Sequence, residues 1–256
     1  MRGFTLIEMV ISIILLSVVG LFLGSVISQG MGIYVDTTAR EALIQQGRFI
    51  TERLSRELRE AVPNSVLVEN DCIEFLPITN SAIYNNLPSP QAASSAIRIL
   101  PINKSVSKGD RLVVYPTNAA LLRQAPSVNG QVAEVDADVE FTDVNRATMV
   151  DVSLTQATGF SIQSPAKRLY FYRAPVAFCY QNQRIYRYAN YPLNRVALTP
   201  AQLGSGVLVA ENLSQASFQV TQPELQRNGL IKIELTFFDR GEEIKFDHDA
   251  LIYNTP

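Results

Sequence analysis

An apolar run of about 19 residues, from Met9 to Ile27, stands near the start of the chain and is interrupted only by serine and glycine. A segment of this length can cross the hydrocarbon core of a bilayer as a helix. Glu8 comes directly before the run, and an acid inside a membrane is costly and usually has a function. The sequence therefore predicts a membrane-spanning helix over about residues 4–28 that carries a carboxylate near its beginning.

Two simpler interpretations account for this segment less well. A secretory signal peptide has an apolar core of about 7–15 residues, followed by an A-x-A-like cleavage site. Here the run is longer, and the residues after it, Ser28-Gln29-Gly30-Met31-Gly32, contain no such site. An ordinary single-pass anchor fits the length of the run but does not explain the acid before it.

The residues around the acid carry a specific resemblance. Gly3-Phe4-Thr5-Leu6-Ile7-Glu8 resembles the class III signal of the type IV pilin family, which includes the pseudopilins of type II secretion. The resemblance implies that a prepilin peptidase cuts between Gly3 and Phe4, removes residues 1–3 as a leader, and methylates the new N-terminus at Phe4. It also implies that Glu8 pairs with the N-terminal amine of a neighbouring subunit during assembly. The physics agrees, because a buried carboxylate needs a partner and an α-amine with a pKa near 8 is cationic at neutral pH.

The resemblance also implies partners and a location. The partners are other minor and major pilins, the prepilin peptidase, the inner-membrane assembly platform and, before assembly, membrane lipid. Arg2 lies on the short N-terminal side, which favours a cytoplasmic N-terminus. We therefore expect a single-pass inner-membrane protein with a periplasmic C-terminal head, which later becomes part of a cell-surface pilus.

The helix is predicted to continue beyond the membrane to residue 62. Apolar or small residues recur there at spacings of three and four, as one face of a helix requires: Leu43, Gly47, Ile50, Leu54, Leu58 and Ala61. Glu52/Arg56 and Arg56/Glu60 stand at i,i+4 and are expected to form supporting pairs. Pro63 ends the helix, because proline lacks an N–H donor and clashes with the preceding turn. Within the apolar half, Gly20 and Gly24 have the spacing of a close helix contact in lipid, which is a weak signal by itself.

The rest of the chain, residues 63–256, is predicted to form one β-rich, sandwich-like head packed on the outer half of the helix, which gives an α+β fold. Hydrophobic residues make up 47% of the chain, enough for a sizeable core. Short β-type runs alternate there with Pro, Asn, Ser and Gly clusters. The clearest pair is Leu230–Phe238 and Glu243–Tyr253, joined by a short turn at Asp239-Arg240-Gly241. Asn182-Gln183 predicts a second hairpin turn. Residues 80–95 read as a surface loop, and residues 117–124 as one short helix turn.

Two cysteines, Cys72 and Cys179, stand far apart in the sequence. In an oxidising periplasm an even pair is expected to form a disulfide, and two buried free thiols are the alternative. No Cys/His cluster indicates a metal site. The formal net charge of −2 gives no sign of nucleic acid as an obligate partner.

Nothing in the sequence indicates an enzyme or a cofactor. His248 is the only histidine and shares the apolar parity of the last predicted strand, so we expect it to be semi-buried rather than catalytic. Asp136, Asp138, Glu140 and Asp143 form an oxygen-rich cluster that could hold calcium, but the glycine and the distal bidentate acid of an EF-hand loop are missing. A solvated strand face is the simpler explanation for these acids.

An aromatic and basic tract is the other candidate ligand site. Arg184, Tyr186, Arg187 and Tyr188 lie close together, with further Tyr and Arg residues nearby, and such a tract can stack bases or sugars or line an interface. It leaves open a tip adhesin or a DNA-binding module. An edge hairpin with outward tyrosines is the structural alternative.

A finer resemblance concerns the large head, the sequence of the helix from Glu52 to Ala61 and the C-terminal segment from Asp247 to Pro256. These resemble the bulky minor pilins, namely the J-type pseudopilins, the W-type minor pilins and most closely the O-type minor pilins of mannose-sensitive haemagglutinin (MSHA) pili. The resemblance implies a non-enzymatic subunit that helps to initiate assembly of a pilus and is incorporated into it. A J-type role in a type II secretion system is the alternative.

Overall fold

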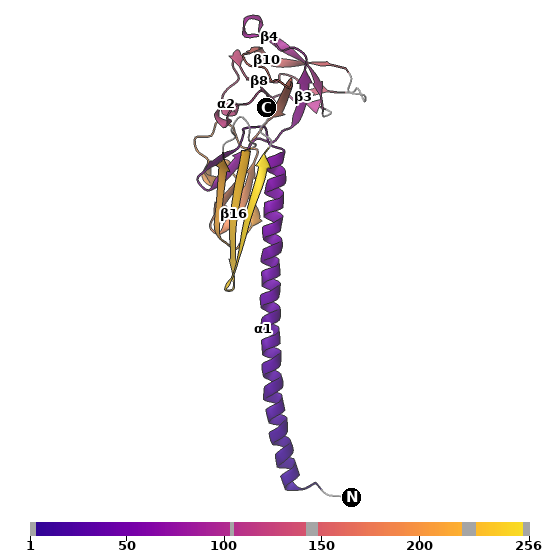
Figure 1. Cartoon of the computed structure of the whole chain (residues 1–256), viewed down its shortest axis with the longest axis vertical. Coiled ribbons are helices and arrows are strands. Elements are labelled where there is room, and N and C mark those ends of the chain that lie inside the picture. The colour runs from indigo at the N-terminus through magenta and orange to yellow at the C-terminus, as the bar shows by residue number, and fades with distance from the viewer. Residues whose placement is uncertain (1–3, 103–104, 142–147, 222–228, 253–256) are drawn as a thin grey trace.

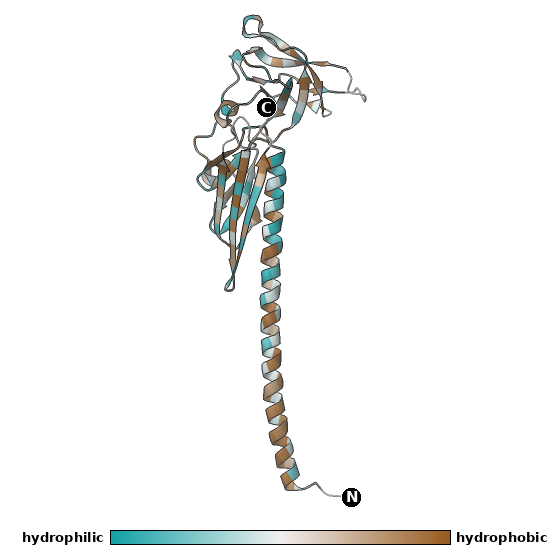
Figure 2. Ribbon diagram, in the orientation of Figure 1, coloured by the Kyte–Doolittle hydropathy of each residue, from teal (hydrophilic) through white to brown (hydrophobic). Residues whose placement is uncertain are grey.

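The computed structural model describes residues 4–102, 105–141, 148–221 and 229–252. One long helix, α1 (Leu6–Arg59), extends far from the rest of the chain, and a β-rich head lies beside and beyond its other end (Figure 1). The expected α+β class is thereby confirmed. Hydropathy divides the helix, since its free half is almost wholly apolar and its head-facing half is mixed (Figure 2).

The helix ends at Arg59, three residues before the expected end at Val62. The backbone after Arg59 pairs with the segment around residues 76–78. The Val62 N–H donates to the Leu76 carbonyl at 2.8 Å, and the Ile78 N–H donates to the Glu60 carbonyl at 2.9 Å. These bonds satisfy groups that a helix would otherwise use. Tertiary pairing therefore ends the helix before the proline does.

Two sheets pack against the upper half of α1. A five-stranded sheet has the order β1 (Leu67–Glu69), β2 (Cys72–Phe75), β12 (Val176–Gln181), β13 (Arg184–Ala189) and β14 (Val207–Ala210). A three-stranded sheet follows, with the order β15 (Leu213–Thr221), β16 (Gly229–Asp239) and β17 (Glu242–Ile252). This part of the head has the sandwich-like character that the sequence predicts.

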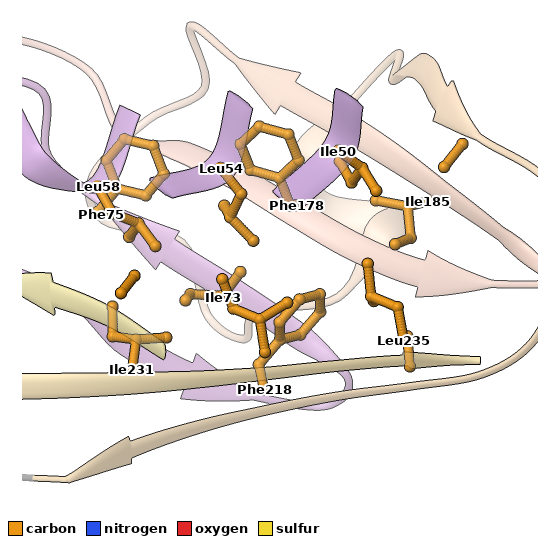
Figure 3. Packing of buried hydrophobic residues seen from close by; sticks show 14 of the residues in the cluster. Ile50, Leu54, Leu58, Ile73, Phe75, Phe178, Ile185, Phe218, Ile231 and Leu235 are labelled. Carbon is orange, nitrogen blue, oxygen red and sulfur yellow. The ribbon is translucent and has the colours of Figure 1, made fainter. Parts of the chain in front are cut away.

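The helix and both sheets share one core (Figure 3). Ile50, Leu54 and Leu58 of α1 are completely buried in it. They meet side chains of the five-stranded sheet, such as Phe178, and of the three-stranded sheet, such as Leu235. Because full burial of such side chains contributes about 1.5–3 kcal/mol each, this seam is what fixes the head to the helix.

The remaining strands form a separate unit beyond the end of α1 (Figure 1). Its order is β7 (Asn129–Gly130), β10 (Val150–Phe160), β4 (Ser94–Pro101), β3 (Asn80–Tyr84), β11 (Arg168–Tyr172), β6 (Arg111–Val114) and β8 (Val132–Glu134). A bridge between Val135 and Leu154 brings the β8 end back to β10, so the sheet curls toward a barrel around its own core, which includes Ile99 and Phe171. Small elements lie around it: η1 (Pro90–Ala92), β5 (Ser105–Val106), β9 (Val139–Glu140), α2 (Ala119–Arg123) and α3 (Pro200–Leu203).

The expected loop over residues 80–95 is wrong in its first part and at its last two residues, which begin β4. Asn80–Tyr84 forms β3, which lies inside the seven-stranded sheet between β4 and β11. Ala82 and Tyr84 point into the core, while Asn80 is buried and its side-chain amide donates to the Ser105 carbonyl at 2.8 Å. The predicted turn of helix within residues 117–124 is present as α2.

Both predicted hairpins are present. Asn182 and Gln183 have φ values of 51° and 62°, the positive values that a two-residue turn of this hand requires. The second hairpin differs by one residue from the expectation. Asp239 pairs with Glu242 inside the ladder, so the turn consists of Arg240 and Gly241 alone.

Cys72 and Cys179 form a disulfide. They face each other on the neighbouring strands β2 and β12, and both are completely buried. The bond joins residues 107 positions apart in the sequence. It therefore ties an early strand of the head to a late one.

Candidate assembly interface

The foot of α1 is closed by a capping box built from Thr5 and Glu8. The Thr5 N–H donates to Glu8 Oε2 at 3.0 Å, and the Thr5 hydroxyl donates to the same oxygen at 2.9 Å. In return the Glu8 N–H donates to Thr5 Oγ1 at 3.4 Å. A helix start has unpaired N–H groups, and this reciprocal arrangement satisfies two of them. Glu8 Oε1 has no partner among the residues that the structure describes.

The local role of Glu8 was missed from the sequence, although the signal is present. Thr5-Leu6-Ile7-Glu8 has the T-x-x-E spacing of a capping box directly before an apolar run. The pairing of Glu8 with a second chain stays a prediction. Of the expected cleavage junction, Phe4 is described and 76% exposed, whereas Gly3 lies outside the described residues.

The stem of α1 has no cover from the head. Every residue from Phe4 to Thr38 is exposed, and the first buried side chain is Leu43. Within the described chain, α1 is the one helix long and apolar enough to span a membrane. A Cβ added at Gly20 or Gly24 would meet no atom within 4 Å, so this chain itself gives those glycines no packing role.

Two hollows mark the surface of α1. The lower one, of about 310 Å³, is mostly apolar and is lined by Phe4, Met9, Ser12, Ile13, Leu16 and Ser17. The upper one, of about 590 Å³, is lined by Phe49, Glu52, Arg53, Ser55, Arg56, Arg59 and Glu60 of α1 and by His248 of β17. His248 is exposed there rather than semi-buried as expected, because its position in β17 borders this open hollow beside the charged side chains of the helix.

The two expected i,i+4 pairs in the upper hollow are absent from the described residues. The ion pair on this stretch of helix is instead Arg53–Glu57, at 3.1 Å. Glu57 also binds Arg187 of β13 at 3.0 Å, so its carboxylate holds the helix to the five-stranded sheet. Glu52, Arg56 and Glu60 are left without an ion-pair partner in the described part of the chain.

The aromatic and basic tract is divided between different surroundings. Arg184 is exposed and lies 3.7 Å from Glu211, whereas Arg187 binds Glu57. Tyr188 is only 3% exposed, and its hydroxyl accepts a hydrogen bond from the Gln181 side-chain amide at 2.6 Å. Tyr186 is half-buried against the core around the disulfide. The four side chains therefore do not make one exposed stacking surface.

The most buried charges of the head were not expected from the sequence. Glu74 of β2 is completely buried and accepts hydrogen bonds from Arg195 at 2.8 Å, from the Tyr191 hydroxyl at 2.7 Å and from Arg123 of α2. Burial alone would raise the pKa of Glu74, but the Arg195 hydrogen bond and the charge of Arg123 hold it below the usual 4.5. Burial and the negative charge of Glu74 raise the pKa of Tyr191. No local sequence pattern predicts this cluster, because its members lie far apart in the sequence.

The acidic residues considered for calcium lie on the surface. Asp136, Asp138 and Glu140 are exposed, and Lys108 contacts two of them, with its ammonium 3.6 Å from Asp136 and its backbone N–H donating to Asp138 at 2.7 Å. Asp143 lies outside the described residues. Among the residues that are described, no three acidic, Cys or His side chains come together as metal ligands would.

Comparison with known proteins gives one match. Residues 1–24 match the family described as the prokaryotic N-terminal methylation motif. No curated protein and no solved structure matches the chain. The motif supports a type IV pilin-like or pseudopilin-like subunit, a structural rather than enzymatic class, and implies assembly with other pilins and processing by the prepilin peptidase. Together with the apolar helix, it fits a subunit anchored in the inner membrane.

Proposed function

We propose that this chain is a minor pilin, which helps to initiate a type IV pilus of the MSHA kind and is incorporated into it. The observation that supports this proposal best is the foot of α1, where a capped acid within the methylation motif begins the exposed apolar stem. Beyond the two bonds from Thr5, Glu8 keeps one oxygen without a partner among the residues that the structure describes. A carboxylate offers about four acceptor positions, so the cap and a neighbour's amine can be bound together.

The assembly step follows from this arrangement. In the bilayer the capping box reduces the cost of holding Glu8 near lipid, because Thr5 hydrogen bonds replace part of its hydration. In the fibre the N-terminal amine of the adjacent subunit binds the free oxygen, which neutralises the charge as the apolar stems pack. The acid thus favours one axial position of a neighbour over all others.

Glu8→Gln tests this role, because the amide keeps the size of the side chain and loses its charge. We expect incorporation into sheared pili to fall by roughly tenfold or more, since a buried charge pair broken on one side costs several kcal/mol. Immunoblots of pilus and membrane fractions measure the ratio. The disulfide between Cys72 and Cys179 should form normally in the variant, which shows that the head is folded. Incorporation equal to wild type would contradict the role.

The leader is tested separately. Gly3→Glu should block cleavage and leave the chain in the membrane at the mass of the full precursor. Intact-mass measurement distinguishes this from wild type, which should begin with methylated Phe4. A variant that still loses its first three residues would refute the cleavage site.

A J-type role in a type II secretion system is the second candidate, since the same motif serves both machines. Deleting the chain should reduce pilus number in the first case and protein secretion in the second. Both are measured in the same strain.

A further inference from the structure

We propose that the tip of the β16–β17 hairpin rests on phospholipid headgroups beside the stem while the chain is anchored in a membrane, with Phe238 and Arg240 as its contact residues. The partner of this surface is a lipid layer rather than another protein. The inference goes beyond the proposed function, because it needs the stem in a bilayer but neither a pilus nor a neighbouring subunit.

The β16–β17 hairpin extends from the head along α1, toward the free half of the helix (Figure 1). Two contacts fix its position on the helix. The ring of Phe246 lies against Gly47, and Glu242, next to the turn, lies 3.3 Å from Arg40. The turn therefore reaches further toward the N-terminus of α1 than the rest of the described head.

The stem places this turn close to a bilayer. Residues 9–35 contain no charged side chain, and these 27 residues (35 minus 9, plus 1) are about 40 Å long at 1.5 Å per residue. A bilayer with its headgroups is about 40–45 Å thick, so Glu8 and Asp36 lie at its two borders. Tyr34 is exposed at the outer end, as aromatic residues at a membrane interface are. Arg40 follows Tyr34 by six residues, or about 9 Å, and a helix tilt of about 20° toward the hairpin brings the turn closer still.

Phe238 is an exposed aromatic residue at the turn end of β16. The outward positions before it, Lys232, Glu234 and Thr236, are polar, and Lys232 binds Glu234 at 2.7 Å. Phe238 is 51% exposed, whereas its neighbour Phe237 is completely buried on the other face of the sheet. An aromatic ring is favoured at headgroup level, where it leaves water without entering the hydrocarbon. The one large apolar side chain among these outward positions is thus the one closest to the membrane.

Arg240 occupies the first position of the turn against its own backbone preference. Its φ is 49°, in the left-handed region that Asn, Asp and Gly adopt most readily. The other hairpin has Asn182 at the equivalent position. Arg240 is exposed and has no ion-pair partner among the residues that the structure describes. A free cation held in an unfavourable turn position points to a ligand outside the chain, and a guanidinium binds phosphate well.

Net charge is not what holds the tip to lipid. Acids and bases are mixed around the turn, since Asp239, Glu242 and Glu243 lie near Arg40, Arg240 and Lys245. The tip is therefore not a basic patch of the kind that requires anionic lipid. Because the stem already tethers the tip beside the surface, its local concentration there is high and a weak contact is sufficient. A zwitterionic phospholipid carries the phosphate that Arg240 needs.

Tryptophan fluorescence of the full-length chain tests the contact. The chain contains no tryptophan, so Phe238→Trp introduces a single reporter at the tip. In phosphatidylcholine nanodiscs, lipid with a spin label on its headgroup should quench this reporter about twofold, because an aromatic ring at the interface lies beside the label. Ile102→Trp is the matched control, since Ile102 is 48% exposed and follows β4 in the unit beyond the end of α1. Quenching at position 238 that is no stronger than at position 102 overturns the inference.

Arg240→Asn in the Phe238→Trp chain separates the lipid contact from the fold. Asparagine suits the positive φ, so thermal unfolding should occur at the same temperature or a higher one. Quenching should fall by about half or more, because the phosphate contact is lost. Lys245→Asn removes the same charge further from the turn on β17 and should leave quenching unchanged. Equal quenching in the two variants would overturn the role of Arg240.

The nanodiscs contain no other protein, so quenching there identifies lipid as the partner. The same measurement keeps this inference apart from the proposed function. A chain whose tip is quenched in nanodiscs but which never enters pili would overturn the proposed function and leave the lipid contact standing. A chain that enters pili but whose tip is not quenched overturns the lipid contact alone.

Discussion

Single residues decide how closely the helix and the head approach each other. At Gly47 a Cβ would lie 2.0 Å from the ring of Phe246 on β17, far inside van der Waals contact. The ring is therefore packed directly on the helix backbone. The sequence places Gly47 on the buried face, but its spacing alone does not show that a glycine is needed there.

Gly47→Ala should destabilise the head by about 1–3 kcal/mol, because the partly buried ring of Phe246 must move away from the helix and lose its packing against the core. Thermal unfolding of the full chain in detergent measures the change. Gly32→Ala is the matched control on the same helix, since a Cβ there meets nothing within 4 Å. Alanine is also the better helix former by about 1 kcal/mol, so the control should lose no stability. Equal effects at both sites would show that the contact with Phe246 is unimportant.

The buried Glu74 cluster gives a pH dependence. Because its pKa in the folded chain lies below 4.5, the ionised carboxylate stabilises the fold at neutral pH. That contribution is fully present above the unfolded pKa and is lost as the pH falls through the lower folded value. Glu74→Gln should cost about 3–5 kcal/mol at pH 7, since it leaves two largely buried arginine side chains without their carboxylate.

Urea unfolding of wild type and Glu74→Gln at several pH values checks this. The difference in unfolding free energy should be constant near neutrality and shrink as the pH falls below about 4.5. Glu243→Gln, on the exposed outer side of β17, is the control and should change little. A difference that persists unchanged into acid would mean that the charge of Glu74 is not what stabilises the cluster.

At the scale of elements, the disulfide and the strand ladder reinforce each other. β2 and β12 are already paired in register, with Cys72 opposite Cys179. The bond closes a long loop that contains most of the barrel-like unit. Its stabilisation is therefore expected to act largely through the unfolded chain.

Replacing both cysteines by alanine should lower the free energy of unfolding by about 2–5 kcal/mol. Chemical unfolding of oxidised wild type, reduced wild type and the double variant checks the value. Reduced wild type and the variant should behave alike, because the lost constraint is the same. A variant as stable as the oxidised protein would show that strand pairing alone holds this region.

The elements that could be predicted are those specified locally. The β16–β17 hairpin follows from strict alternation around a turn, and α1 follows from apolar spacing over many turns. β3 was missed because Asn80 and Ser81 carry no β signal, and its position is set by distant strands β4 and β11. The Glu74 cluster was missed for the same reason, since it joins residues from β2, α2 and the segment after β13. Glu8 was recognised as important, but its capping box with Thr5 was missed although the T-x-x-E spacing is present in the sequence.

At the scale of the whole molecule, the head depends on only part of its helix. Contacts with the sheets begin near Arg40, which lies 3.3 Å from Glu242, and Leu43 is the first buried side chain. The stem before them contributes nothing to the core. The two functions of α1, as a scaffold for the head and as a stem, are therefore separable along its length.

A chain that begins at Asp36 should fold as a soluble head with nearly the same stability as the full chain. A chain that begins at Phe49 loses the packing of Leu43 and Gly47 and should be less stable by about 2–5 kcal/mol. Thermal unfolding and size-exclusion chromatography compare the two. Aggregation of the longer chain would show that the lower stem does support the head.

The uncovered stem also limits how the protein can leave the membrane. Its apolar side chains would cost tens of kcal/mol if water surrounded them, because each large one loses about 1.5–3 kcal/mol on leaving an oily environment. For the pilus subunit proposed above, this excludes a freely diffusing intermediate between lipid and filament. Each turn of helix that leaves the bilayer would already contact the growing polymer.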